Sequence, residues 1–158
     1  MSELKELMLR EPRLTLAVAE SLTCGNVQAQ VGRIPGASGF FLGGITAYTL
    51  DQKVRHLGVD RTAAAAVDCV SASVAEQMAR GAATLFGADI GLATTGYAEP
   101  APKVPVPFAW WALARHTPAG WQVQSARIEC PGAARVQVQA QVSATVLTAL
   151  LTHLRASR

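Results

Sequence analysis

The chain has 158 residues, of which 50% are hydrophobic and 16% are charged. This length is typical of a single domain, and the apolar content is enough for a sizeable hydrophobic core. The net charge of +3 comes from residues scattered along the sequence with no lysine- or arginine-rich run, which argues against nucleic-acid binding. Apolar runs are too short to cross a bilayer, and the N-terminus lacks a signal-peptide core. We therefore expect one soluble, cytoplasmic domain with no membrane partner.

The expected elements alternate between helices and strands. In chain order they are a helix at 2–10, a strand at 14–19, a helix at 27–33, a strand at 40–49, a helix at 51–58, an alanine-rich turn at 62–67, a helix at 72–87, a strand at 88–96, a hairpin of strands at 108–116 and 121–129, and a helix at about 133–155. Asp51 and Ser71 are the expected caps of their helices. This order predicts an α/β fold, a three-layer α/β/α domain whose sheet is mixed because of the hairpin.

Ser21 lies between the first strand and the helix that follows it, in the sequence AESLTCGN at 19–26. A serine at such a corner is a candidate nucleophile, because the unpaired N–H groups at a helix start can hold an anion or a developing oxyanion. The alternative is that Ser21 or Thr23 only caps the helix. The carboxyl ends of the first three strands should bring Ser21, Tyr48 and Thr95 to one rim of the sheet.

A nucleophilic serine needs a base, and the histidines are poorly placed for this role. His56, His116 and His153 fall in a helix, a hairpin edge and the last helix, without a Ser-His-Asp order. Lys53 is the better candidate, because a desolvated lysine loses its proton readily and it follows Tyr48 closely. The alternative is a solvated lysine on a short helix.

The three cysteines, Cys24, Cys69 and Cys130, are far apart and form no CxxC pair. This spacing argues against a disulfide framework and against a zinc site. We expect the cysteines to be reduced and partly buried. Redox sensing through Cys24 remains an alternative, because a helix start lowers the pKa of a thiol.

Long motifs cover most of the sequence. They are AESLTCGN at 19–26, PGAS at 35–38, GG at 43–44, YTLDQK at 48–53, LGV at 57–59, VSASVAEQMARGA at 70–82 and ADIGLATTG at 88–96. Together they closely resemble the C-terminal domain of the CinA (competence/damage-inducible) family. We therefore expect residues 1–158 to form a single CinA C-terminal-like domain, in the form that lacks the family's separate N-terminal domain.

The resemblance implies an activity, because this family includes nicotinamide mononucleotide amidohydrolases. It implies Ser21 as the nucleophile, Lys53 as its base and Tyr48 as a hydrogen-bonding neighbour. The expected substrate contacts are Thr23, Gly25, Gly44, Thr95, Gly96 and Arg135. Backbone N–H groups near residues 23–25 would stabilise the oxyanion, and neither a metal nor a cofactor is implied.

Several positions depart from the family pattern. Cys24 replaces a glycine next to Gly25 and is expected to narrow the pocket. Glu99 replaces another glycine, and its carboxylate would face the phosphate of a mononucleotide. The basic residue of the family that could meet this phosphate is either shifted by one position, to Arg135, or lost. The partner expected from the sequence is a small molecule, and a homo-oligomer stays open. The alternative function is a catalytically weakened ligand-binding or regulatory protein.

Overall fold

The structure, a computed structural model, describes residues 2–157. In chain order its elements are α1 (Ser2–Leu9), β1 (Leu16–Glu20), α2 (Asn26–Gly32), a 3-10 turn (Ala37–Gly39), β2 (Phe41–Thr46), α3 (Leu50–Leu57), α4 (Arg61–Ala65), α5 (Ala72–Phe86), β3 (Ile90–Gly96), β4 (Phe108–Thr117), β5 (Gly120–Glu129) and α6 (Arg135–Ala156). The five strands form one sheet in the order β2-β1-β3-β4-β5.

The sheet is mixed, as the sequence predicts. Strand β1 pairs in parallel with both β2 and β3, whereas β4 runs antiparallel to β3 and to β5. The three parallel strands therefore have their carboxyl ends at the same edge of the sheet. This edge is where Ser21, Tyr48 and Thr95 were expected to meet.

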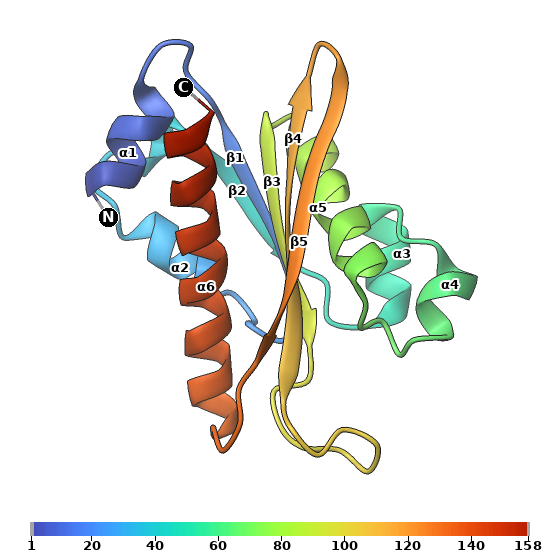
Figure 1. The fold of residues 1–158 in the computed structure, drawn as a ribbon. Helices are drawn as coiled ribbons and strands as arrows, with labels where there is room; N and C mark the ends of the chain where they lie inside the picture. Colours follow the sequence, from blue (N-terminus) through green and yellow to red (C-terminus); the bar gives the residue numbers. More distant parts are fainter. Residues whose placement is uncertain (1, 158) are drawn as a thin grey trace.

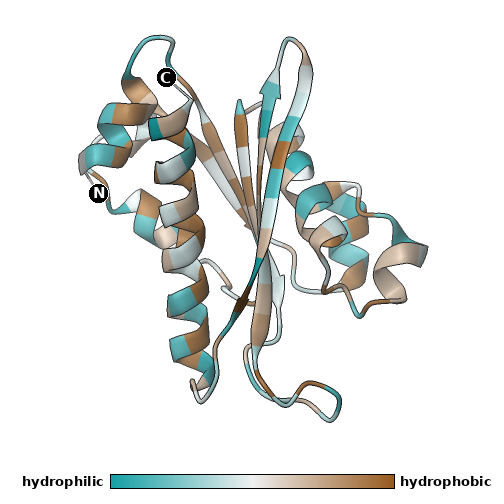
Figure 2. Cartoon of the chain, in the orientation of Figure 1, coloured by the Kyte–Doolittle hydropathy of each residue, from teal (hydrophilic) through white to brown (hydrophobic). Residues whose placement is uncertain are grey.

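Helices cover both faces of the sheet and complete the three layers (Figure 1). Helices α1, α2 and α6 lie on one face, and α3, α4 and α5 lie on the other. Large side chains such as Leu16, Phe40 and Leu150 fill the first interface. Figure 2 shows hydrophobic residues along the central strands and alternating with hydrophilic ones around the helices. This alternation is the pattern of helices that bury one face.

Two local predictions were wrong. Helix α3 begins after Thr49, so Asp51 is not its cap and instead pairs with Arg61 on the surface at 2.6 Å. The alanine-rich segment contains the short helix α4, whose first turn is capped by Asp60 accepting a hydrogen bond from the Ala63 N–H. Ser71 caps α5 as expected, by accepting from the Val74 N–H. None of the helices within residues 2–157 has the length and apolar character that crossing a bilayer requires.

Small residues let α5 approach the sheet closely. The second core cluster is dominated by alanine, including Ala79 and Ala82 of α5 and Ala93 of β3. Gly91 in β3 faces α5 so closely that an added Cβ atom would overlap the backbone carbonyl of Ala79. This spacing fixes the position of α5 and of the segment that leads into it, which borders the pocket described below.

We expect Gly91→Ala to lower the free energy of unfolding by about 2 to 3 kcal/mol, because a methyl group cannot enter a close-packed interface without displacing backbone. Gly32→Ala is the matched control, since an added Cβ there meets nothing within 4 Å and alanine favours helix. The control should be neutral or stabilising by up to about 1 kcal/mol. Urea unfolding measures both variants, and equal stability of the two would contradict the close packing of α5.

Candidate active site

Ser21 and Lys53 meet at the carboxyl end of the parallel strands. Ser21 comes directly after β1, and its N–H donates to the carbonyl of Thr94 in β3 at 3.1 Å, which fixes the serine backbone against the sheet. The Lys53 Nζ atom lies 2.9 Å from the Ser21 Oγ atom and donates to the Tyr48 carbonyl at 3.0 Å. Two residues 32 positions apart in the chain therefore form one hydrogen-bonded pair.

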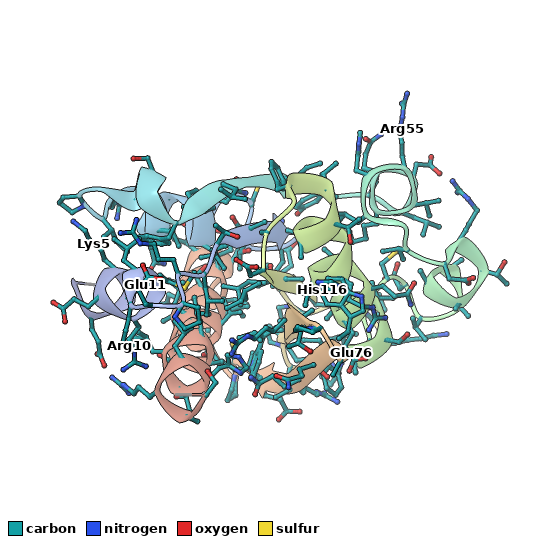
Figure 3. The ribbon with its side chains drawn as sticks, turned by 90° about the horizontal axis from the view of Figure 1, so that it is seen from above. Lys5, Arg10, Glu11, Arg55, Glu76 and His116 are labelled. Atoms are coloured by element: carbon teal, nitrogen blue, oxygen red, sulfur yellow. The ribbon has the colours of Figure 1, made fainter. Side chains whose placement is uncertain are left out.

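The environment of Lys53 favours the neutral amine. Only 1% of the residue is exposed, and this burial lowers the pKa of its ammonium group. Cys69 and Asp68 act in the opposite direction and raise the pKa, without reversing the shift. Arg55, two residues further along α3, extends away from the molecule (Figure 3). The alternative of a solvated lysine at position 53 was therefore wrong.

A pocket of about 410 Å³ opens over the pair. Its lining includes the expected residues Ser21, Tyr48, Lys53, Thr95, Gly96 and Arg135, together with Asp68, Cys69, Tyr97 and Glu99. A larger hollow of about 580 Å³ is lined partly by Lys5, Asn26 and Arg33. It contains no nucleophile paired with a base, so we place the candidate site in the smaller pocket.

The start of α2 is capped by Glu20, which the sequence did not single out. Its fully buried carboxylate accepts hydrogen bonds from the N–H groups of Val27 and Gln28 at 2.8 and 3.0 Å, from the Gln28 side chain at 2.9 Å and from the Thr23 hydroxyl at 2.7 Å. Gly25 is the N-cap residue, and its conformation is left-handed with φ 93°. The alternative, that Ser21 or Thr23 caps the helix, was therefore wrong, and the Ser21 hydroxyl is hydrogen-bonded to Lys53 instead.

Three expected substrate contacts lie outside the pocket lining. Thr23 is buried, and its hydroxyl bonds to Glu20 and Thr94. Gly25 terminates the turn before α2. Gly44 lies in β2, where an added Cβ atom would collide with the Gln28 side chain. These residues build the turn and its support, and the close approach of Gln28 to the sheet is what requires glycine at position 44.

Cys24 does not narrow the pocket as expected. Its side chain is exposed and it is absent from the pocket lining. The backbone at Cys24 has φ 47°, a left-handed conformation that glycine adopts more easily. A cysteine in place of the family's glycine at position 24 therefore raises the conformational free energy of the turn and does not reduce the space for a substrate.

Not every N–H group of this turn is available for an oxyanion. Those of Val27 and Gln28 donate to Glu20, and that of Cys24 donates to the Ser21 carbonyl at 3.1 Å. Within the expected segment at 23–25, the N–H groups of Thr23 and Gly25 make no such bond, although neither residue belongs to the pocket lining. The first N–H groups of α2 are thus already bound by the Glu20 carboxylate.

Arg135, Tyr48 and Glu99 form a cluster at the mouth of the pocket. The Arg135 Nη2 atom donates to the Tyr48 Oη atom at 2.7 Å, and its Nη1 atom lies 3.0 Å from Glu99 Oε1. The Tyr48 carbonyl accepts from Lys53, so Tyr48 contacts both the base and the cluster. The mouth thereby joins the first turn of α6, the loop after β3 and the segment between β2 and α3.

Asp68, Cys69 and Tyr97 also line the pocket, and sequence reasoning missed them. Asp68 and Cys69 adopt consecutive left-handed conformations with φ 52° and 59°. The Tyr97 hydroxyl donates to Asp68 at 3.0 Å, and the Thr95 hydroxyl donates to the Cys69 carbonyl at 2.6 Å. Burial, together with Asp68, raises the pKa of the Tyr97 phenol. Residues with such strained backbone are concentrated at functional sites. The alanine-rich sequence before them contains no pattern that predicts a left-handed conformation at these two positions.

The residues described, 2–157, contain no cluster of three or more His, Cys, Asp or Glu side chains that could hold a metal ion. The chemistry that this pocket offers from its own residues is that of the Ser21 hydroxyl, an amine with a lowered pKa, two phenols, two carboxylates and a guanidinium group. Such a set suits attack on an electrophilic carbon.

The fold and this pocket define a three-layer α/β/α domain with a serine–lysine pair at the carboxyl end of its parallel strands. Residues 1–154 match the CinA C-terminal domain family. A CinA-like protein from Chlorobaculum tepidum is 40% identical over 152 residues, which are 94% of this chain and 36% of that protein. Another from Frankia casuarinae is 40% identical over 138 residues, 87% of this chain and 31% of that protein. The chain therefore belongs to the CinA C-terminal domain family and spans about a third of the length of these curated relatives.

Solved structures agree with this assignment. A competence-damaged protein (CinA) superfamily protein from Klebsiella pneumoniae has a TM-score of 0.87 and 27% identity, covering 98% of this chain and 94% of that one. A superfamily protein from Escherichia coli has a TM-score of 0.81 and 26% identity, covering 95% and 90%. The expected family and fold class are thus confirmed.

We expect Glu20→Gln to lower the free energy of unfolding by about 2 kcal/mol, because hydrogen bonds to a charged group are stronger and an amide nitrogen would face N–H donors. Glu6→Gln is the control, since Glu6 is exposed on α1 and should change stability by less than about 0.5 kcal/mol. Urea unfolding of the two variants makes the comparison. Equal unfolding midpoints would show that Glu20 does not hold the turn that carries Ser21.

Proposed function

We propose that this domain hydrolyses a primary carboxamide of the nicotinamide mononucleotide class, with Ser21 as nucleophile and Lys53 as general base. The observation that carries the proposal is the 2.9 Å contact between the Lys53 Nζ atom and the Ser21 Oγ atom, with a lysine whose pKa is lowered by burial. A hydroxyl attacks an amide only when a base accepts its proton, and a neutral amine at this distance can do so. Membership of the CinA C-terminal domain family supports the same chemistry.

The reaction follows from these positions. Neutral Lys53 accepts the Ser21 proton as the Oγ atom bonds to the amide carbon, and the carbonyl oxygen becomes an oxyanion near the turn at 22–25. The Lys53 ammonium then protonates the amide nitrogen, which leaves as ammonia, while Ser21 holds the acyl group as an ester. Water attacks this ester with Lys53 again accepting a proton. The bond between the acyl carbon and the Ser21 oxygen then breaks as Lys53 returns its proton to that oxygen, and the carboxylic acid product releases its own proton to solvent and leaves as a carboxylate.

We expect Ser21→Ala and Lys53→Met each to lower kcat for ammonia release by at least about a thousandfold, because the two residues act as one unit. The double variant should lose no more than the more damaged single variant. Lys53→Met should also leave the free energy of unfolding unchanged or raise it by up to about 1 kcal/mol, since a buried amine is replaced by an apolar chain. Ser38→Ala and Lys5→Met are the matched controls, because Ser38 is exposed near Gly36 and Lys5 belongs to α1.

The measurement is ammonia release from nicotinamide mononucleotide, its riboside and simple primary amides. Activity retained in either Ser21→Ala or Lys53→Met would exclude the serine–lysine mechanism. Wild-type protein that binds such an amide without releasing ammonia would instead support the alternative, a ligand-binding member of the family.

The pH profile provides an independent test of the base. Because burial lowers the pKa of Lys53, kcat/KM should rise with pH and level off below the usual lysine value near about 10.4. Asp68 raises this pKa, so Asp68→Asn should move the rising limb to lower pH. The control Asp51→Asn removes an exposed carboxylate that pairs with Arg61 and should leave the limb in place. A profile that is the same in wild type and Asp68→Asn would contradict the proposed role of Lys53.

A further inference from the structure

The Arg135 side chain at the mouth of the pocket is positively charged, and the Glu99 carboxylate of the same protein pairs with it. Of the described residues that line the pocket, four have side chains that are charged in water: Lys53, Asp68, Glu99 and Arg135. Lys53 lies at the bottom against Ser21, and Arg135 lies at the mouth. The Arg135 guanidinium contacts the Glu99 carboxylate at 3.0 Å through one terminal nitrogen and the Tyr48 hydroxyl at 2.7 Å through the other.

Arg135 would otherwise be well placed to bind a phosphate. A guanidinium group binds phosphate oxygens through two parallel N–H donors. It is also the first residue of α6, a helix of 22 residues whose first turn contains no acidic side chain, so the helix N-terminus and the guanidinium present positive charge together. Glu99 meets this charge from the loop after β3. The protein thus supplies its own anion where the phosphate of a nucleotide would be attracted.

A second carboxylate strengthens this effect. Asp68 lines the same pocket and accepts a hydrogen bond from the Tyr97 hydroxyl at 3.0 Å. With Lys53 in its neutral form, the pocket holds two carboxylates against one guanidinium. A phosphate group would have to displace Glu99 from Arg135 or lie beside a like charge, whereas an uncharged ribose or a cationic pyridinium ring meets no such cost.

We propose that the Glu99–Arg135 pair makes this pocket selective for carboxamides without a phosphate group, an inference that rests on the proposed function. A pyridinium carboxamide riboside would then be preferred over its 5′-phosphate. Glu99 is the specificity-determining residue, and Arg135 is the group whose phosphate affinity it cancels. The pair is largely exposed, with side-chain exposures of 65% and 43%, so it contributes little to stability and can be altered without unfolding the domain.

The size of the effect follows from this exposure. Like charges at about 4 Å weaken binding from several-fold in water to about a thousandfold at the lower effective dielectric of a protein surface. Because Glu99 and Arg135 are both well solvated, we expect phosphate binding to be weakened near the lower end of this range, by about tenfold. The effect should shrink as salt screens the charges.

The test compares kcat/KM for nicotinamide riboside and nicotinamide mononucleotide at low and high salt. Wild type should favour the riboside by about tenfold at low salt. Glu99→Gln should raise the ratio of kcat/KM for the mononucleotide to kcat/KM for the riboside by about tenfold. The double variant Glu99→Gln/Arg135→Gln should not show this gain in the ratio, because it lacks the guanidinium group that would bind the phosphate. Glu6→Gln, the same change on α1 at the opposite end of β1 (Figure 1), should alter neither substrate.

The outcomes separate this inference from the proposed function. A wild type that favours the mononucleotide, or a Glu99→Gln variant with an unchanged ratio between the substrates, would overturn the inference while leaving the hydrolase intact. If neither compound releases ammonia, calorimetric titration with the same two compounds replaces the kinetics. The same order of affinities and the same effect of Glu99→Gln would then support the inference alone. Absence of binding by both compounds to both proteins would overturn it.

Discussion

The central constraint in this domain is a lysine amine held in the interior beside a serine hydroxyl. Water would keep that amine charged, so the contact between Lys53 and Ser21 can serve the proposed hydrolysis only because the fold excludes solvent from it. Two distant segments must meet to achieve this. The end of β1 presents the serine, and the first turns of α3 bring the lysine over it, with the Tyr48 carbonyl accepting another of its hydrogens.

The surrounding structure keeps that contact in place. Glu20 uses its carboxylate to tie the turn after Ser21 to the start of α2, and Thr94 accepts the Ser21 N–H from the neighbouring strand. The close approach of α5 to Gly91 fixes the helix behind the left-handed pair Asp68 and Cys69. The site therefore combines a buried amine with left-handed backbone at two consecutive residues, and both features lower stability.

Sequence reasoning located the parts of the site that depend on topology. The strand order places the ends of β1, β2 and β3 together, so Ser21, Tyr48 and Thr95 could be expected at one rim, and the motif spacing added Lys53. Contacts that depend on side-chain direction were not accessible. Gly44 lies inside β2 and faces α2, and Glu20 turns inward from a strand that is otherwise apolar. The pairing of Glu99 with Arg135 joins segments separated by more than thirty residues.

The central claim is that Lys53 gives up its proton more easily than an ordinary lysine. The chain has only three lysines, Lys5, Lys53 and Lys103, so a protein labelled with 13C at the lysine Cε position gives three signals that can be followed against pH by NMR. The signal that disappears in Lys53→Met should titrate clearly below the usual lysine value of about 10.4, because burial lowers the pKa of that amine. A Lys53 signal that titrates near that usual value would contradict the account.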